Sequence, residues 1–156
     1  MKKITPFLWF NDNAEEAVNF YLSVFKNSKI KSVTHYGEGT YIPAGMVMTI
    51  EFELDGEEFV AMNGGPMYHF TEAISFVIDC ETQEEVDYFW SRLSEGGQEQ
   101  ACGWLKDKYG LSWQVTPRIL MEMLSSPDKV RAQRATEAML KMIKIDIALL
   151  KKAWEG

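Results

Sequence analysis

Few residues in this sequence are of the types that bind metals or attack substrates. Its two histidines, His35 and His69, are far apart, and neither has a second histidine or an acidic residue at ligand spacing. Its two cysteines, Cys80 and Cys102, form no Cys-x-x-Cys motif, and we interpret both as packing residues of a reducing compartment. No pair or triad of residues has the sequence spacing of a nucleophile and its catalytic base. Chemistry centred on histidine or cysteine is therefore not predicted.

Glu51 is the acidic residue whose position most suggests chemistry. It lies in segment 46–54, where apolar residues occupy every even position and Val47, Thr49, Glu51 and Glu53 the odd ones, as in a half-buried strand. Glu51 would share a face with Thr49 and could act there as a general base. A solvated strand carboxylate is the alternative, so Glu51 alone does not define a reaction.

An internal repeat supplies the elements that would position such groups. Segments 7–21 and 74–90 each contain a short apolar strand, an aspartate and an amphipathic helix that ends in an aromatic pair. We expect Asn13 and Thr82 to cap these helices, because a glutamate stands at the third helical position of each. The repeat predicts two related modules.

Strand-like segments follow each helix. In the first copy they cover 30–36, 46–54 and 58–62, with Asp55-Gly56 as a hairpin turn, and in the second copy 101–107 and 111–116. These patterns predict an α+β fold in which a β-α-β-β-β module occurs twice, over about 1–66 and 70–117 of one domain, 1–117. After Pro117, residues 118–156 are expected to form a helical extension that packs on this domain or on a partner subunit.

Composition and charge restrict the partners. At 156 residues and 46% hydrophobic, the chain suits one domain. Its net charge of -7, without a long basic run, argues against nucleic-acid binding. Charged residues soon follow the N-terminus and no long apolar stretch occurs, so we expect a cytoplasmic protein without a membrane partner.

Several of these features recur in one group of proteins. The paired modules, with Phe20-Tyr21 closing the first helix and segment 107–114 in the last hairpin, resemble the vicinal oxygen chelate superfamily, which includes glyoxalase I, extradiol dioxygenases and bleomycin resistance proteins. More narrowly, the chain resembles the PhnB-like branch, often labelled as the 3-demethylubiquinone-9 3-methyltransferase domain. Five segments carry this narrower resemblance: 4–10, 62–66, 70–76, 102–107 and 144–147. It implies a curved mixed sheet around a cleft.

The resemblance also implies where a metal would bind. Enzymes of the superfamily take one ligand from the first and one from the last strand of each module, usually His or Glu. Carried over, these positions fall near Pro6, Met62 or its neighbour Asn63, Ala73 and Gln114. Such side chains are poor ligands for divalent ions, and the glutamine offers only a neutral carbonyl. We expect no metal and no other cofactor, with a divalent metal as the alternative.

The branch label implies methyl transfer, which would need a site for a sulfonium cofactor. Such sites usually use a Gly-rich turn between a parallel strand and a helix. Gly37-Glu38-Gly39 leads through Pro43 into another strand, and Gly64-Gly65-Pro66 opens no helix. Methyl transfer therefore ranks third among the functions considered.

Strand parity in the superfamily geometry implies which side chains face the cleft. In the first module Pro6, Leu8 and Phe10 should face it, whereas Phe7 and Trp9 should pack under the helix. In the second module, the residues expected in the cleft are Ala73, Ser75, Ser112, Gln114 and Thr116, and those expected under the helix are Ile74, Phe76 and Trp113.

Hydrogen-bonding and aromatic groups would orient a ligand in such a cleft. Gln114, Ser75 and Asn63 are the expected polar contacts. Trp104 could supply a stacking face beside the cationic Lys106, although a core tryptophan and a solvated lysine are the alternatives. The predicted ligand-binding residues are Leu8, Phe10, Glu51, Asn63, Ser75, Trp104, Lys106, Ser112 and Gln114.

Two functions of different classes follow. The first is a metal-independent binding protein of the bleomycin-resistance kind for an aromatic or amphipathic small molecule. The second is a superfamily enzyme, a lyase, isomerase or dioxygenase that uses a divalent metal. In either case we expect a homodimer, which could exchange modules between chains, because an exposed cup and an apolar C-terminal helix are costly in a monomer.

Overall fold

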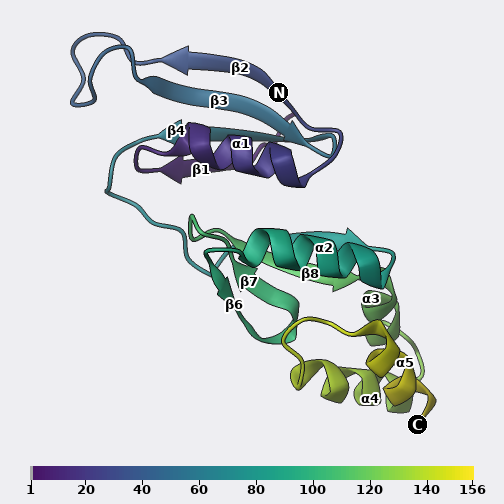
Figure 1. Ribbon diagram of the computed structural model, residues 1–156. Helices are drawn as coiled ribbons and strands as arrows, with labels where there is room; N and C mark the ends of the chain where they lie inside the picture. The colour runs from purple at the N-terminus through teal and green to yellow at the C-terminus, as the bar shows by residue number, and fades with distance from the viewer. Residues whose placement is uncertain (1) are drawn as a thin grey trace. The chain divides into compact units, whose positions relative to one another are not determined.

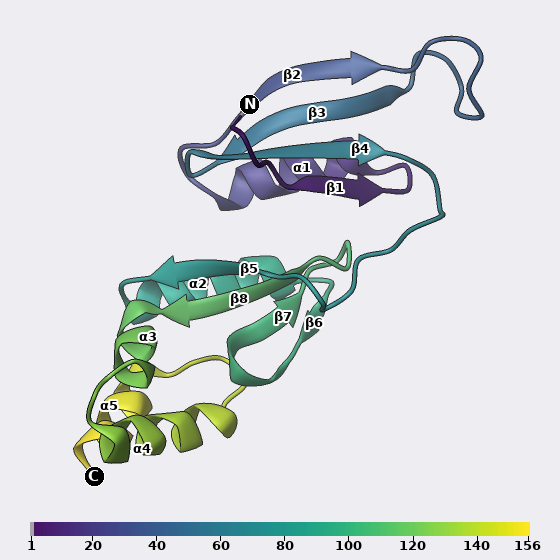
Figure 2. The same ribbon diagram turned by 180° about the vertical axis from the view of Figure 1, so that it is seen from behind.

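The computed structural model describes residues 2–156 and divides into two compact units between Phe70 and Thr71. Each unit contains one β-α-β-β-β module built on a four-stranded sheet (Figures 1 and 2). The predicted α+β fold with two such modules and a C-terminal helical extension is therefore confirmed.

The first unit has strands in the spatial order β1-β4-β3-β2 and one helix, α1. Strands β1 and β4 are parallel, and the other neighbours are antiparallel. Burial alternates along β3, where Ile50 and Phe52 are buried and Glu51 and Glu53 are half-buried, as the period of two predicts. The element bounds are β1 Phe7–Phe10, α1 Ala14–Val24, β2 Lys29–His35, β3 Val47–Leu54 and β4 Glu57–Asn63.

The second unit repeats this topology with the strand order β5-β8-β7-β6 and the helix α2. Strands β5 and β8 are parallel, and β7 pairs antiparallel with both β8 and β6. The bounds are β5 Phe76–Cys80, α2 Gln83–Ser94, β6 Gln98–Glu99, β7 Trp104–Lys106 and β8 Ser112–Pro117.

The predicted strand 101–107 is only partly a strand. Its first residues form a short 3-10 segment, η1 Ala101–Gly103, in which Cys102 and Gly103 have φ of 60° and 80°. These left-handed conformations do not continue a strand. The backbone N–H groups of Cys102 and Gly103 donate instead to the carbonyl oxygens of Met142 and Ile143.

The two module helices begin in different ways. Thr82 caps α2 as predicted, since its Oγ1 accepts a hydrogen bond of 3.2 Å from the Glu85 N–H. Asn13 is the N-cap residue of α1 as predicted, but its side chain makes no capping hydrogen bond. The oxygen that accepts from the Ala14 N–H, at 2.8 Å, belongs to Asn63 at the end of β4. A distant residue thus replaces the local cap.

The C-terminal extension consists of α3 Arg118–Leu124, α4 Lys129–Leu140 and α5 Ile147–Glu155. It has a small core of its own, which includes Leu120, Met142 and Leu150. Gln83 at the start of α2 fastens the extension to its own unit, because its side chain donates to the Ile145 carbonyl and accepts from the Ile147 N–H. Among residues 2–156, none of the helices has the length and hydropathy needed to span a membrane.

Candidate functional site

The face of the second sheet opposite α2 gathers five of the predicted ligand contacts. Strand register places Gln114 on β8 between Val77 on β5 and Trp104 on β7, and Lys106 opposite Ser112. Residues of the other parity are buried on the side of the sheet that α2 covers: Ile78, Leu105, Trp113 and Val115. The parity predicted for Ser112, Trp113 and Gln114 is therefore correct.

The middle of this face combines an amide, a hydroxyl and apolar surface. Gln114 Nε2 donates a hydrogen bond of 2.9 Å to Ser75 Oγ, which orients the amide and leaves its carbonyl oxygen for a ligand. Trp104 is half-buried beside it, and Val77 is 57% exposed. Apolar surface with a few oriented polar groups is typical of a small-molecule site.

One end of the face carries an ion pair that the sequence did not predict. Lys106 Nζ lies 2.6 Å from an oxygen of Glu72, whose side chain is 51% exposed. The hydrogen bond from Lys106 holds the pKa of Glu72 below its ordinary value. Glu72 lies in the loop before β5, outside any strand or helix pattern, so nothing in the sequence pointed to it.

Ser112 and Thr116 are less accessible than the sequence suggested. Ser112 is fully buried and Thr116 is 7% exposed. The Ser112 hydroxyl is buried without a hydrogen-bond partner in the described chain. A buried hydroxyl of this kind calls for an explanation, because its desolvation is not offset. Ile74, expected under the helix, is 61% exposed because β5 begins two residues later.

The parity predicted for β1 is wrong. Leu8 and Phe10 are 6% and 4% exposed, and pair with the buried-face residues Ala61 and Asn63, so they lie on the α1 side of the sheet. Phe7, expected under the helix, is 56% exposed. All four residues of the strand Phe7–Phe10 are large and apolar, so the sequence alternation carries no signal of which face is buried.

The two polar candidates of the first unit have different surroundings. The Asn63 amide is fully used: its oxygen caps Ala14, and its Nδ2 donates to Glu15 Oε1 at 2.9 Å and to the Val47 carbonyl at 3.1 Å. Asn63 therefore has a structural role that the sequence did not predict. Glu51 is half-buried on the sheet face opposite α1, as expected.

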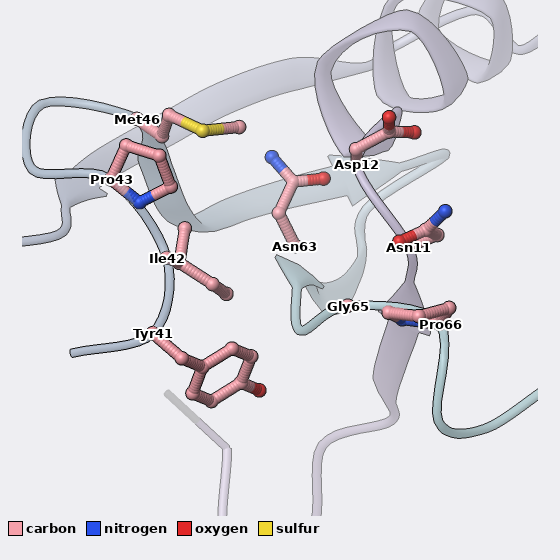
Figure 3. A pocket seen from close by; sticks show the side chains of 9 residues that line it. All are labelled: Asn11, Asp12, Tyr41, Ile42, Pro43, Met46, Asn63, Gly65 and Pro66. Atoms are coloured by element: carbon pink, nitrogen blue, oxygen red, sulfur yellow. The ribbon is translucent and has the colours of Figure 1, made fainter.

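The first unit also has a cavity of about 220 Å³ that the sequence did not predict (Figure 3). The loop between β2 and β3 forms one wall, and the Tyr41 hydroxyl ties this loop to the Gly64 carbonyl at 2.6 Å. Asn63 lies between this wall and Asn11 in Figure 3, but its amide is already engaged. The lining residues are Asn11, Asp12, Tyr41, Ile42, Pro43, Met46, Asn63, Gly65 and Pro66.

The residues present fit neither a divalent metal nor a sulfonium cofactor. Among residues 2–156, no three His, Cys, Asp or Glu residues lie close enough together to hold a metal ion. His35 and His69 are both exposed. For a sulfonium cofactor, β4 would have to lead through a Gly-rich turn into a helix, but Gly64-Gly65-Pro66 leads into a loop.

Comparisons with known proteins agree with this architecture. A family model described as 3-demethylubiquinone-9 3-methyltransferase matches residues 2–116. Among solved structures, the PhnB protein from Bacillus cereus is 39% identical, with a TM-score of 0.68, over 74% of this chain and 99% of that chain. No curated protein matches the sequence.

Two more distant structures share the fold. Protein PA1353 from Pseudomonas aeruginosa is 20% identical, with a TM-score of 0.63, over 75% of this chain and 98% of that chain. The fosfomycin resistance protein FosX from Listeria monocytogenes is 16% identical, with a TM-score of 0.56, over 81% of this chain and 100% of that chain.

Proposed function

Because the chain belongs to the 3-demethylubiquinone-9 3-methyltransferase family, the PhnB-like branch of the vicinal oxygen chelate superfamily, we propose that it binds a small organic molecule without a metal. The binding surface is the face of the β5-β8-β7-β6 sheet opposite α2. The ligand is aromatic or amphipathic, and the chain holds it without transforming it.

One observation supports this proposal: Ser75 before β5, Gln114 on β8, and Trp104 and Lys106 on β7 lie on one sheet face. A surface used only for packing would be apolar, and one used only for solvation would not hold a half-buried tryptophan beside an oriented amide. The combination of stacking surface and fixed hydrogen-bonding groups suits an organic ligand.

The side chains at the candidate metal and cofactor positions do not fit a metal-dependent enzyme or a methyltransferase. The resemblance places the superfamily metal ligands near Pro6, Met62 or its neighbour Asn63, Ala73 and Gln114, which do not suit a divalent ion. Methyl transfer lacks a fitting cofactor turn. We therefore propose that the family name reflects sequence similarity to other members and not a methyltransferase activity of this chain.

Ligand binding can be tested by calorimetry with an aromatic fragment set. We expect Trp104→Ala and Gln114→Ala each to weaken binding of any fragment that binds, by about 10-fold for the loss of one buried stacking or hydrogen-bonding contact. Gln133→Ala on the exposed surface of α4 is the matched control and should leave affinity unchanged. Binding that survives both site substitutions would contradict the proposal.

The metal and cofactor alternatives need their own measurement. Elemental analysis of untagged protein purified without chelator should find less than one divalent metal per ten chains. Calorimetric titration with common divalent ions and with the sulfonium cofactor should give no heat. Near-stoichiometric metal would make the metal-dependent enzyme the leading function.

We also propose that the protein is a cytoplasmic homodimer. Strand β2 is a sheet edge that is exposed along its whole length, with Ile30 and Val33 at 41% and 42%, and such edges are usually covered. The free thiols of Cys80 and Cys102 suit a reducing compartment. Light scattering at low micromolar concentration should return twice the chain mass of 17.9 kDa, and a value of one chain mass would refute the dimer.

A further inference from the structure

The ion pair of Glu72 and Lys106 joins a loop to the proposed binding face. Lys106 belongs to β7, whereas Glu72 lies in the loop that precedes β5. Half of the Glu72 side chain is in contact with solvent, so the pair is weak and another anion can replace the carboxylate. Because its pKa is lowered by the hydrogen bond from Lys106, Glu72 is ionised throughout the neutral range.

The hydroxyl of Ser112, next to Lys106, has no hydrogen-bond partner among the described residues. Ser112 lies directly opposite Lys106 in the antiparallel register of β7 and β8, so both side chains project from the same face about 5 Å apart. Within the described residues the Ser112 hydroxyl is buried and has no hydrogen-bond partner while Glu72 holds Lys106. An ammonium and an unsatisfied hydroxyl side by side are the donors that a carboxylate accepts from.

An aromatic ring lies two residues before Lys106 on the same strand. Trp104 precedes Lys106 by two residues, so it shares its face at a distance of roughly 7 Å. Gln114 lies opposite Trp104 and Val77 follows on β5, so the surface beyond the cation combines an indole ring, an amide and an exposed valine. A ligand that reaches from Lys106 to Trp104 needs an anion attached directly to a ring.

We infer that the ligand is a planar aromatic carboxylate, and that Glu72 occupies the position of its anion when the site is empty. The incoming carboxylate displaces Glu72 from Lys106, reaches the buried Ser112 hydroxyl once this ion pair has opened, and accepts its hydrogen bond, while the ring packs on Trp104. This inference rests on the proposed function and adds the ligand class and an internal competitor to it.

Benzoate and benzamide, which have the same shape and differ in charge, are the probes. On the full chain, calorimetry should give benzoate a Kd at least about tenfold lower than benzamide, the usual difference for a charge-assisted hydrogen bond. Lys106→Met should remove this difference by weakening benzoate alone. Lys141→Met, an exposed lysine at the end of α4, is the control and should change neither Kd.

The competitor role makes a prediction of the opposite sign. Glu72→Gln should tighten benzoate binding about two- to fivefold, because it frees Lys106 from an exposed ion pair, and should leave benzamide unchanged. In a Lys106→Met background the same change should have no effect. Lys106→Gln replaces Lys106→Met if the latter lowers the unfolding temperature.

The outcomes separate this inference from the function on which it rests. Equal binding of the two probes, with both weakened by Trp104→Ala, would overturn the carboxylate class and leave the binding face in place. Weaker benzoate binding in Glu72→Gln would overturn the competitor role. Failure of benzoate to bind at millimolar concentration would overturn the inference, and failure of the whole fragment set would overturn the proposed function as well.

Discussion

Asn63 is a polar residue of the first unit whose role depends on contacts distant in sequence. Its amide joins the start of α1 to the end of β4 and to β3, through Ala14, Glu15 and Val47. From the sequence, Asn63 was expected to contact a ligand at the end of a strand. Local sequence patterns cannot show that the Asn13 side chain, 50 positions earlier, leaves the start of α1 uncapped and that Asn63 takes its place. The structural role is a consequence of tertiary contact alone.

Asn63→Asp should lower the free energy of unfolding by about 1–3 kcal/mol, measured by urea denaturation. The new carboxylate keeps the acceptor for Ala14 but loses both donors and lies against Glu15. Asn11→Asp, an exposed residue near the same helix end, is the control and should change stability by less than about 0.5 kcal/mol. Equal effects of the two substitutions would show that Asn63 has no such structural role.

The two cysteines should differ in reactivity. Burial, reinforced by the carboxylates of Glu85 and Asp79, raises the pKa of Cys80 to about 12, whereas an unfolded cysteine ionises near about 8.5. Between these values the folded state keeps a proton that the unfolded state releases, so this group favours folding below about pH 8.5, and that contribution is lost as the pH rises towards 12. We expect mass spectrometry after iodoacetamide treatment at pH 8 to find Cys102 modified in the native protein and both cysteines modified in urea. Rapid native modification of Cys80 would contradict its burial.

At the scale of elements, the C-terminal extension fixes the short segment before β7. The carbonyl oxygens of Met142 and Ile143 accept hydrogen bonds from the N–H groups of Cys102 and Gly103, and Ile145 packs on Gly103. Since Trp104 follows at once, the extension and the proposed binding face are linked through the backbone of η1. A glycine is required there, because a Cβ on Gly103 would lie 3.0 Å from both Ile145 and the Val115 carbonyl.

Gly103→Ala should therefore destabilise the protein more than a glycine substitution in open space. Gly110 is the matched control: it has a φ of 89° against 80° for Gly103, and a Cβ there would meet no described atom within 4 Å. Gly110→Ala should cost about 1–2 kcal/mol for the left-handed backbone, and Gly103→Ala a further 1–3 kcal/mol for overpacking. Thermal denaturation of both variants measures the difference, and equal costs would mean that Ile145 moves aside freely.

The elements with strong local signals could be predicted from the sequence. Period-two alternation specified β3, Asp55-Gly56 specified its hairpin, and Pro117 marked the end of β8. Two features had no such signal. The run Phe7–Phe10 is apolar on both faces, so the sequence could not show which face of β1 is buried. The conformation of η1 depends on hydrogen bonds to Met142 and Ile143, which lie 40 positions later in the sequence.

For the whole molecule, the resemblance read from the sequence is confirmed by the family match over residues 2–116 and by the PhnB structure from Bacillus cereus. That structure covers 74% of this chain while 99% of its own length is matched, so the present chain is longer than the relative. The family model ends at residue 116, and α3, α4 and α5 follow that boundary. The sheet face was predicted correctly for Ser112, Trp113 and Gln114 in the second unit and incorrectly for Leu8 and Phe10 in the first, whereas ligand binding by these residues stays a prediction.

We propose above all that the sheet face bearing Trp104 and Gln114 binds an organic ligand without a metal. The most direct test is nuclear magnetic resonance of chelator-treated protein with an aromatic fragment set, following the side-chain signals of Trp104, Gln114 and Lys106. Bound fragments should shift these signals in the absence of metal, while the Tyr41 and Asn11 signals of the first-unit cavity stay in place. Shifts confined to that cavity, or shifts that appear only after a divalent ion is added, would contradict it.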